Sequence, residues 1–297
     1  MSDFVQQQNS ISDFATSDSW VILSPIEQSI KKKIEAVGTP LKDWDINIYR
    51  GVLTGCNEAF IISSEKRDEI LANCQTEDER KRTEELIRPI LRGRDIKRYG
   101  YVDNGLYLIN THNGVKGKFP RIEIDDYPAV KAHLDQYWDR IATRADKGDT
   151  PYNLRNCAYL EDFSRPKIIW KRIGSILRFS YDNKRCLGLD STCFAIGGHI
   201  EYLCCVLNSL MGHYLLKDSP KTGTGDLLVS VQAIEPARIP YLPQYDEQLS
   251  SLLNIQIASP SVAIEKEIND IVFAMFGLSP NEREYVTQYV KQSQQSQ

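Results

Sequence analysis

The stretch INIYRGVLTGCNEAFII, residues 46–62, marks the point where the sequence changes from helical to strand-like. Ile46 and Ile48 alternate with more polar neighbours, which is typical of a strand with one buried face. Glycine, threonine and asparagine residues between positions 51 and 57 provide turn chemistry, and the apolar run at residues 59–62 predicts a second strand. We therefore expect a β-rich part of the fold that begins at residue 46.

Helical signals lie on both sides of this part. Ser24-Pro25-Ile26-Glu27 is a capping box that predicts a helix as far as Val37. From His199 onward, apolar residues keep helical spacing to Lys217, and further helices are expected over residues 247–257, over 262–276 and from a capping box at Ser279. The sequence thus predicts an α+β fold, in which an irregular β-rich region with inserted helices is followed by a helical C-terminal part.

Three regions follow from these signals. Residues 1–45 are expected to be a connector and helix, residues 46–198 a β-rich region, and residues 199–297 a helical region with one returning strand at about residues 227–231. Inside the β-rich region we expect one helix over residues 128–144. The expected short strands cover residues 105–110, 121–124, 166–170, 176–181 and 194–196.

Composition excludes several classes of protein. The chain has 297 residues, 41% of them hydrophobic, and a formal net charge of −4, which is typical of globular proteins and not of disordered chains. No apolar run is long enough to span a membrane, and the polar N-terminus does not resemble a secretion signal. The seven cysteines form no C-x-x-C pair, so we expect reduced thiols, no zinc site and a cytoplasmic location.

The basic residues are unevenly distributed along the chain. Residues 165–185 contain seven basic residues and one acid, residues 80–98 contain eight basic residues and three acids, and residues 241–297 contain seven acids and three basic residues. Local potential, more than net charge, attracts a polyanion. The pattern indicates a nucleic-acid-binding face, although basic runs can also be ordinary surface that nearby acids neutralise.

Motifs for independent catalysis are missing from the sequence. It contains no G-x-G-x-x-G, no phosphate-binding loop, no H-E-x-x-H and no G-x-S-x-G. It also lacks the motifs that bind S-adenosylmethionine or hold a flipped adenine. Glu123, Asp125 and Asp126 are the acids that a metal-dependent nuclease would use, but they precede a helix and fit capping roles better.

Several stretches, in the right order, resemble the TaqI-like C-terminal specificity domain of adenine-specific DNA methyltransferases and type IIG restriction–modification enzymes. The resemblance is carried by YRGVLTGCNEAFII (49–62), IRPILRGRDIKRY (87–99), DKGDTPYNLR (146–155), FSRPKIIW (163–170), residues 202–216, IPYLP (239–243), and residues 276–284. It covers about residues 45–290. It implies a β-rich recognition region followed by helices, and a role in recognising double-stranded DNA.

The resemblance also implies that methylation and cofactor binding belong to a part of the enzyme outside this chain. The methyltransferase half that precedes the domain in the family is absent, so the chain is expected to be a fragment of a longer enzyme or a split specificity subunit. We expect no cofactor in this chain, S-adenosylmethionine in the missing domain, and a methyltransferase partner in cis or in trans. The alternatives are a protein-interaction module without autonomous DNA binding, and the nuclease mentioned above.

The candidate DNA contacts are basic or turn-forming residues. Arg suits bidentate contacts with guanine or phosphate, and Lys suits phosphate contacts. For Arg92, Arg94, Lys97 and Arg98, the alternative is an internal ion-pair network with Asp95, Glu84 and Glu85. For residues 54–57, a purely structural turn is favoured. The candidates are Arg92, Arg94, Lys97, Arg98, Lys167, Lys171, Arg172, Arg178, Asn57, Thr54, Lys116, Lys118 and Lys221.

Overall fold

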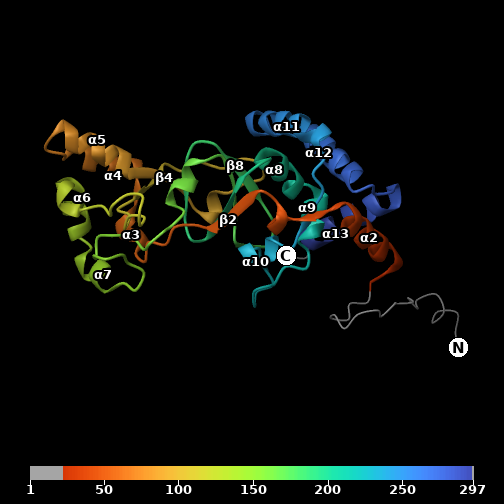
Figure 1. The fold of residues 1–297 in the computed structure, drawn as a ribbon, viewed down its shortest axis with the longest axis horizontal. Coiled ribbons are helices and arrows are strands. Elements are labelled where there is room, and N and C mark those ends of the chain that lie inside the picture. Colours follow the sequence, from red (N-terminus) through yellow and green to blue (C-terminus); the bar gives the residue numbers. More distant parts are fainter. Residues whose placement is uncertain (1–22, 296–297) are drawn as a thin grey trace.

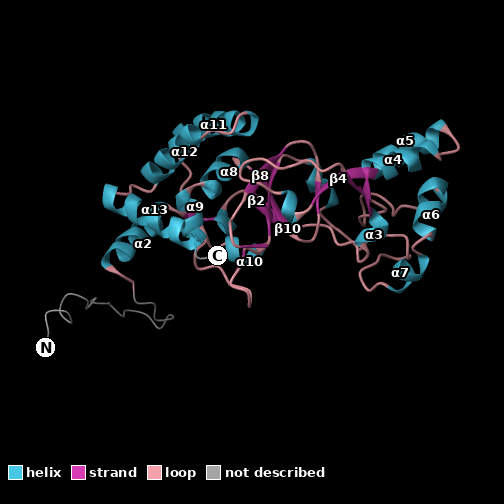
Figure 2. Cartoon of the chain, turned by 180° about the vertical axis from the view of Figure 1, so that it is seen from behind, coloured by secondary structure: helices cyan, strands magenta, loops and turns pink. Residues whose placement is uncertain are grey.

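A computed structural model describes residues 23–295 of the chain; residues 1–22 and 296–297, including most of the expected connector, lie outside this range. The α+β prediction is confirmed. Figure 1 shows an elongated molecule with α4, α5, α6 and α7 at one end and α2, α12 and α13 at the other. Figure 2 shows that the strands lie mainly between these two helical ends.

The described α-helices are concentrated in two parts of the chain. They are α2 (Pro25–Val37), α3 (Asn57–Phe60), α4 (Ser64–Ala72), α5 (Glu77–Leu86), α6 (Pro128–Asp135), α7 (Trp138–Thr143), α8 (Ile200–Asn208), α9 (Leu210–Leu215), α10 (Val231–Ile234), α11 (Asp246–Ala258), α12 (Val262–Met275) and α13 (Pro280–Gln295). Short 3-10 turns add η1 (Leu41–Asp43), η2 (Gly93–Asp95), η3 (Ile124–Asp126), η4 (Leu160–Ser164) and η5 (Pro243–Tyr245).

The strands are short. They are β1 (Thr39–Pro40), β2 (Ile46–Arg50), β3 (Ile61–Ser63), β4 (Ile87–Leu91), β5 (Leu106–Ile109), β6 (Lys167–Lys171), β7 (Ile173–Gly174), β8 (Phe179–Asp182), β9 (Leu187–Gly188), β10 (Thr192–Gly197), β11 (Leu227–Leu228) and β12 (Arg238–Ile239).

The central sheet has the order β2-β10-β6-β8, and all its neighbours are antiparallel. Phe194 of β10 lies between Tyr49 of β2 and Ile169 of β6, so the sheet joins segments almost 150 positions apart. A second sheet, β3-β5-β4-β9, lies against α3, α4 and α5. Together with α6 and α7, these elements form what we call the outer lobe. The parallel pair β4–β9 connects that lobe to the centre.

Two hydrophobic cores share the central sheet. Ile168 and Trp170 of β6 belong to the core that the C-terminal helices cover. Ile169, between them, belongs to the core of the outer lobe. Because side chains alternate across a strand, β6 is covered on both faces and its apolar residues form a continuous run.

The two ends of the described chain meet in the helical part. The Ser24 capping box predicted from sequence is present and starts α2. On α2, Ser29 Oγ and Lys33 Nζ donate to the Glu282 carboxylate of α13, at 2.8 and 2.5 Å. Glu282 also accepts a 2.7 Å bond from Ser279 N, which confirms the capping box predicted there. One carboxylate thus caps α13 and joins it to α2.

Several predicted elements are wrong in detail. Residues 59–60 are helical and not extended, and residues 121–123 form no strand. The helix expected over residues 128–144 is interrupted at residues 136–137. The helix expected from His199 to Lys217 breaks at Ser209, because the Ser209 hydroxyl accepts from Gly212 N and caps a new helix, α9. The returning strand covers only residues 227–228, and Val231 already begins α10.

Candidate nucleic-acid interface

A rigid turn, η2, presents the first group of candidates. Asp95 is 2% exposed and accepts bonds from Arg92 N at 2.8 Å and from Arg92 Nε and Nη2 at 3.0 Å. Asn104 Nδ2 adds a fourth bond at 2.8 Å. Burial would raise the pKa of Asp95, but these hydrogen bonds and the Arg92 charge outweigh it and hold the pKa below its ordinary value. Arg92 is therefore occupied inside the turn by Asp95, whereas Glu84, another acid of the ion-pair alternative, pairs with Arg67.

Gly93 brings Lys171 against this turn. Gly93 N donates to Ser191 Oγ at 3.1 Å, and a Cβ added at Gly93 would lie 2.9 Å from Lys171 Cγ. The absence of a side chain at position 93 therefore lets Lys171 pack directly beside η2. Arg94 and Lys171 are both exposed, and neither side chain has a hydrogen bond or ion pair with the described residues.

Lys97 and Lys221 lie beside the neighbouring strands β8 and β7. Lys97 N is anchored by Ser180 Oγ of β8, and its exposed Nζ reaches only the Arg94 carbonyl, at 3.3 Å. Lys221 is exposed on a hairpin whose strand β11 pairs with β7, directly after β6. We call Arg94, Lys97, Lys171 and Lys221 the sheet-edge basic surface. Four predicted contacts from three distant segments are thus assembled around the ends of β6, β7 and β8.

Lys167 corrects one of the predictions. Basic residues alternate with isoleucines between positions 167 and 178, which predicts that Lys167 and Lys171 share an exposed basic face. The Lys167 side chain is instead 0% exposed. Its Nζ lies 2.5 Å from Asp182 Oδ2 and 2.7 Å from the Phe163 carbonyl oxygen. Burial lowers the pKa of the Lys167 amine, while the Asp182 carboxylate opposes this shift. Because both faces of β6 are covered, a lysine at its first position is enclosed and cannot reach DNA.

Three further candidates are less exposed, and one of them, Arg98, is engaged within the protein. Arg98 donates to Glu265 at 3.0 Å and to the Asn208 carbonyl at 2.7 Å, and so links its hairpin to the C-terminal helices. Arg172 and Arg178 are only partly exposed. Arg172 Nε is buried without a hydrogen-bond partner among the described residues.

A loop of the outer lobe carries Lys116 and Lys118. Gly114 and Gly117 have φ of 74° and 81°, a conformation that favours glycine, and they shape the loop. Lys116 is exposed and has no ion pair with the described residues. Lys118 Nζ lies 2.6 Å from Glu161 Oε2, and this hydrogen bond raises the pKa of Lys118. Lys116 is the free cation of this loop.

Residues 54–57 form a structural turn. Thr54 is 2% exposed; its hydroxyl donates to Asn57 Oδ1 at 2.6 Å and accepts from Cys56 N at 3.2 Å. Gly55 has a φ of 66°, and a Cβ there would lie 2.7 Å from the Asp146 carbonyl. The two side chains are used within the turn, which agrees with the structural interpretation.

The acids of the nuclease alternative do not form a metal site. Arg121 Nε binds Glu123 Oε1 at 2.8 Å, while Asp125 and Asp126 lie in η3 at the start of α6. Over residues 23–295 no group of three His, Cys, Asp or Glu side chains is arranged to hold a metal ion. None of the helices in that range is both long and apolar enough to cross a membrane.

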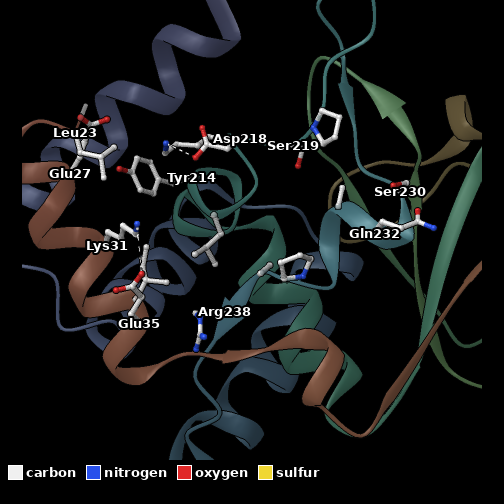
Figure 3. A pocket seen from close by; sticks show the side chains of 17 residues that line it. Leu23, Glu27, Lys31, Glu35, Tyr214, Asp218, Ser219, Ser230, Gln232 and Arg238 are labelled. Carbon is white, nitrogen blue, oxygen red and sulfur yellow. Dashed lines mark hydrogen bonds and ion pairs between the residues drawn. The ribbon is translucent and has the colours of Figure 1, made fainter. Parts of the chain in front are cut away.

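A cavity of about 580 Å³ lies between α2, the end of α9 and α10. Figure 3 shows Glu27, Lys31 and Glu35 on one wall and Tyr214 and Asp218 across from them. Three acids and three basic residues line it, so its charges balance. No glycine lines it, and it therefore lacks the close backbone approach that glycine-rich cofactor loops provide.

Comparisons with known proteins relate the chain to one family. The TaqI-like C-terminal specificity domain matches residues 88–235. The structure is similar to the type IIL restriction–modification enzyme MmeI, which was solved in complex with DNA: the TM-score is 0.58 at 9% identity, over 88% of this chain and 37% of that one. The type IIG restriction endonuclease BpuSI gives a TM-score of 0.44 at 12% identity, over 85% of this chain and 33% of that one. This chain thus spans about a third of either. No curated protein matches it.

Proposed function

Because this chain belongs, through residues 88–235, to the family of TaqI-like C-terminal specificity domains, we propose that it recognises double-stranded DNA at a specific sequence. The observation that carries the proposal is the sheet-edge basic surface. It gathers four exposed cations on a protein whose formal net charge is −4.

The chemistry of this surface fits a DNA backbone. Most protein–DNA hydrogen bonds go to phosphate and sugar, and they set the register in which other side chains read base edges. The η2 turn that carries Arg94 is fixed by the buried Asp95, and Lys171 packs beside Gly93. Ordering these backbone segments therefore costs little when DNA binds.

The catalytic part of the proposal lies outside this chain. A domain in cis or a subunit in trans would bind S-adenosylmethionine and methylate an adenine that this domain selects. An endonuclease fused to it would make the whole a restriction–modification enzyme. The chain itself would contribute no catalytic residue, so it should not methylate DNA when incubated with S-adenosylmethionine alone.

Salt-dependent DNA binding tests the proposal. Fluorescence anisotropy with a random-sequence 30-base-pair duplex, recorded at several salt concentrations, gives the slope of log affinity against log salt. Each neutralised phosphate contributes a slope of about −0.9. The triple variant R94A/K171A/K221A should reduce the magnitude of this slope by about 2.7.

A matched control removes three other exposed lysines that have no ion pair with the described residues. K32A/K42A/K291A changes the net charge equally but touches α2, η1 and α13. If both triple variants lower affinity equally, net charge and not this surface governs binding. Sequencing the duplexes that the wild-type chain retains from a random pool then shows whether it selects a motif. No retention at low salt would instead favour a protein-interaction module.

A further inference from the structure

A second basic element lies at the other end of the central sheet, in the turn that joins β8 to β9. Asp182, 1% exposed, holds this turn from inside. Its Oδ1 accepts from Lys184 N at 3.0 Å, and its Oδ2 accepts from Cys186 N at 3.0 Å. Tyr101 Oη donates to the same carboxylate at 2.9 Å, and Lys167 neutralises its charge. The carboxylate is therefore fully used in fixing residues 182–186.

Arg88 holds the turn from its other side. Its Nη2 donates to the Arg185 carbonyl at 2.9 Å and to Ser164 Oγ at 3.2 Å. Arg185 itself has a φ of 61°, the left-handed region that residues other than glycine and asparagine seldom adopt. A residue other than glycine that is held in this backbone conformation is a reason to look for a function at that position.

The two cations at the tip of the turn are free. Lys184 and Arg185 are exposed, and neither side chain has a hydrogen bond or ion pair with the described residues. Arg185 and Arg88 also repel each other, which adds to burial in lowering the pKa of Arg88. With Asp182 already neutralised by Lys167, the turn carries uncompensated positive charge that an anion would relieve.

On the strength of the proposed function, we propose that Lys184 and Arg185 bind phosphates of the DNA backbone, separately from the sheet-edge basic surface. Asp182 pairs in register with Lys167 at one end of β6, whereas Lys171 lies at the other end. Four residue steps along a strand separate these ends by about 13 Å. The turn therefore meets phosphates that the sheet-edge basic surface does not.

This assignment also gives Lys167 a role. Lys167 is a positioning residue, because it neutralises the carboxylate that fixes the turn. The sequence pattern connected this lysine with DNA contact, and the structure connects it with DNA only through the turn that it supports.

Anisotropy titrations of the full chain against the random 30-base-pair duplex test the assignment. K184A/R185A should reduce the magnitude of the salt slope by about 1.8, so the affinity advantage of the wild type should fall about 12-fold between 50 and 200 mM salt. R185G should reduce it by about 0.9 while its unfolding midpoint is unchanged or higher, because glycine suits the φ of this position. The matched control is K32A/K291A.

The outcomes separate this assignment from the proposed function. If the wild type binds with a steep salt dependence and K184A/R185A keeps the full slope, the turn does not contact DNA and only this assignment is overturned. If the wild type shows no salt-dependent binding, the proposed function fails and the assignment fails with it. Because phosphate contacts carry no sequence information, K184A/R185A should weaken binding to a selected motif and to random duplexes equally. A loss confined to the selected motif would overturn the phosphate assignment.

Discussion

Replacing Lys167 with methionine removes one half of a buried ion pair and keeps an unbranched side chain of similar length. Lys167 Nζ and Asp182 Oδ2 lie 2.5 Å apart, and both side chains are 0% exposed. Removing one partner of such a pair costs about 3–5 kcal/mol, because the remaining charge stays buried without compensation. Asp182 keeps its bonds from Tyr101, Lys184 and Cys186, so we expect the lower value, about 3 kcal/mol.

Denaturant unfolding followed by circular dichroism measures the loss of unfolding free energy in K167M. Thermal unfolding should show a midpoint lower by about 6 °C, because 1 kcal/mol shifts the midpoint of a chain of this size by about 2 °C. Lys171→Ala, at the exposed end of β6, should change stability by less than about 0.5 kcal/mol. Our assignment of Lys167 is refuted if K167M unfolds like the wild type and K171A does not.

Three other positions give predictions. Burial would raise the pKa of Glu282, but hydrogen bonds from Lys33, Ser279 and Ser29 lower it to about 2. The stability that this group adds is therefore complete above its unfolded-state pKa and is lost as the pH falls towards 2. E282Q should flatten the pH dependence of unfolding between these two pH values. Gly51→Ala places a Cβ against the Leu189 carbonyl oxygen, where there is no room for it, and should cost at least about 1–3 kcal/mol in denaturant unfolding. Asn208→Ala leaves the Phe179 backbone N–H and carbonyl without their amide partner and should cost about 2–4 kcal/mol. Replacing the exposed Asn254 of α11 with alanine should cost under about 1 kcal/mol.

Local signals predicted what local interactions determine. The capping boxes at Ser24 and Ser279 lie within four residues, and both start helices where the sequence indicated. The turn at residues 54–57 was favoured as purely structural, and the Thr54 hydroxyl binds Asn57 within it. These features depend on neighbours in the sequence, so they can be recognised without knowing the fold.

Features that depend on contacts between distant segments could not be predicted from the sequence. The run Lys167–Lys171 was interpreted as a strand with one basic face, but α8 covers one side of β6 and the outer-lobe core covers the other. The continuous apolar run Ile168-Ile169-Trp170 is typical of a strand covered on both faces, but the interpretation gave more weight to the flanking basic residues. The tip of the turn at Lys184 and Arg185 was also missed as a site, because its backbone is fixed by Asp182 and Arg88 and not by a turn motif.

The pairing of β2 with β10 has a consequence for engineering chimaeric proteins. The segment that matches the family, residues 88–235, excludes β2 and the helices α11, α12 and α13 that cover the C-terminal core. A graft cut at residues 88 and 235 would leave β10 with an unpaired edge and expose that core, and such edges promote aggregation. Because Glu282 links α2 to α13, a graft that keeps the fold should begin before Ser24 and end after α13. The transplantable unit is therefore almost twice as long as the segment that sequence comparison marks.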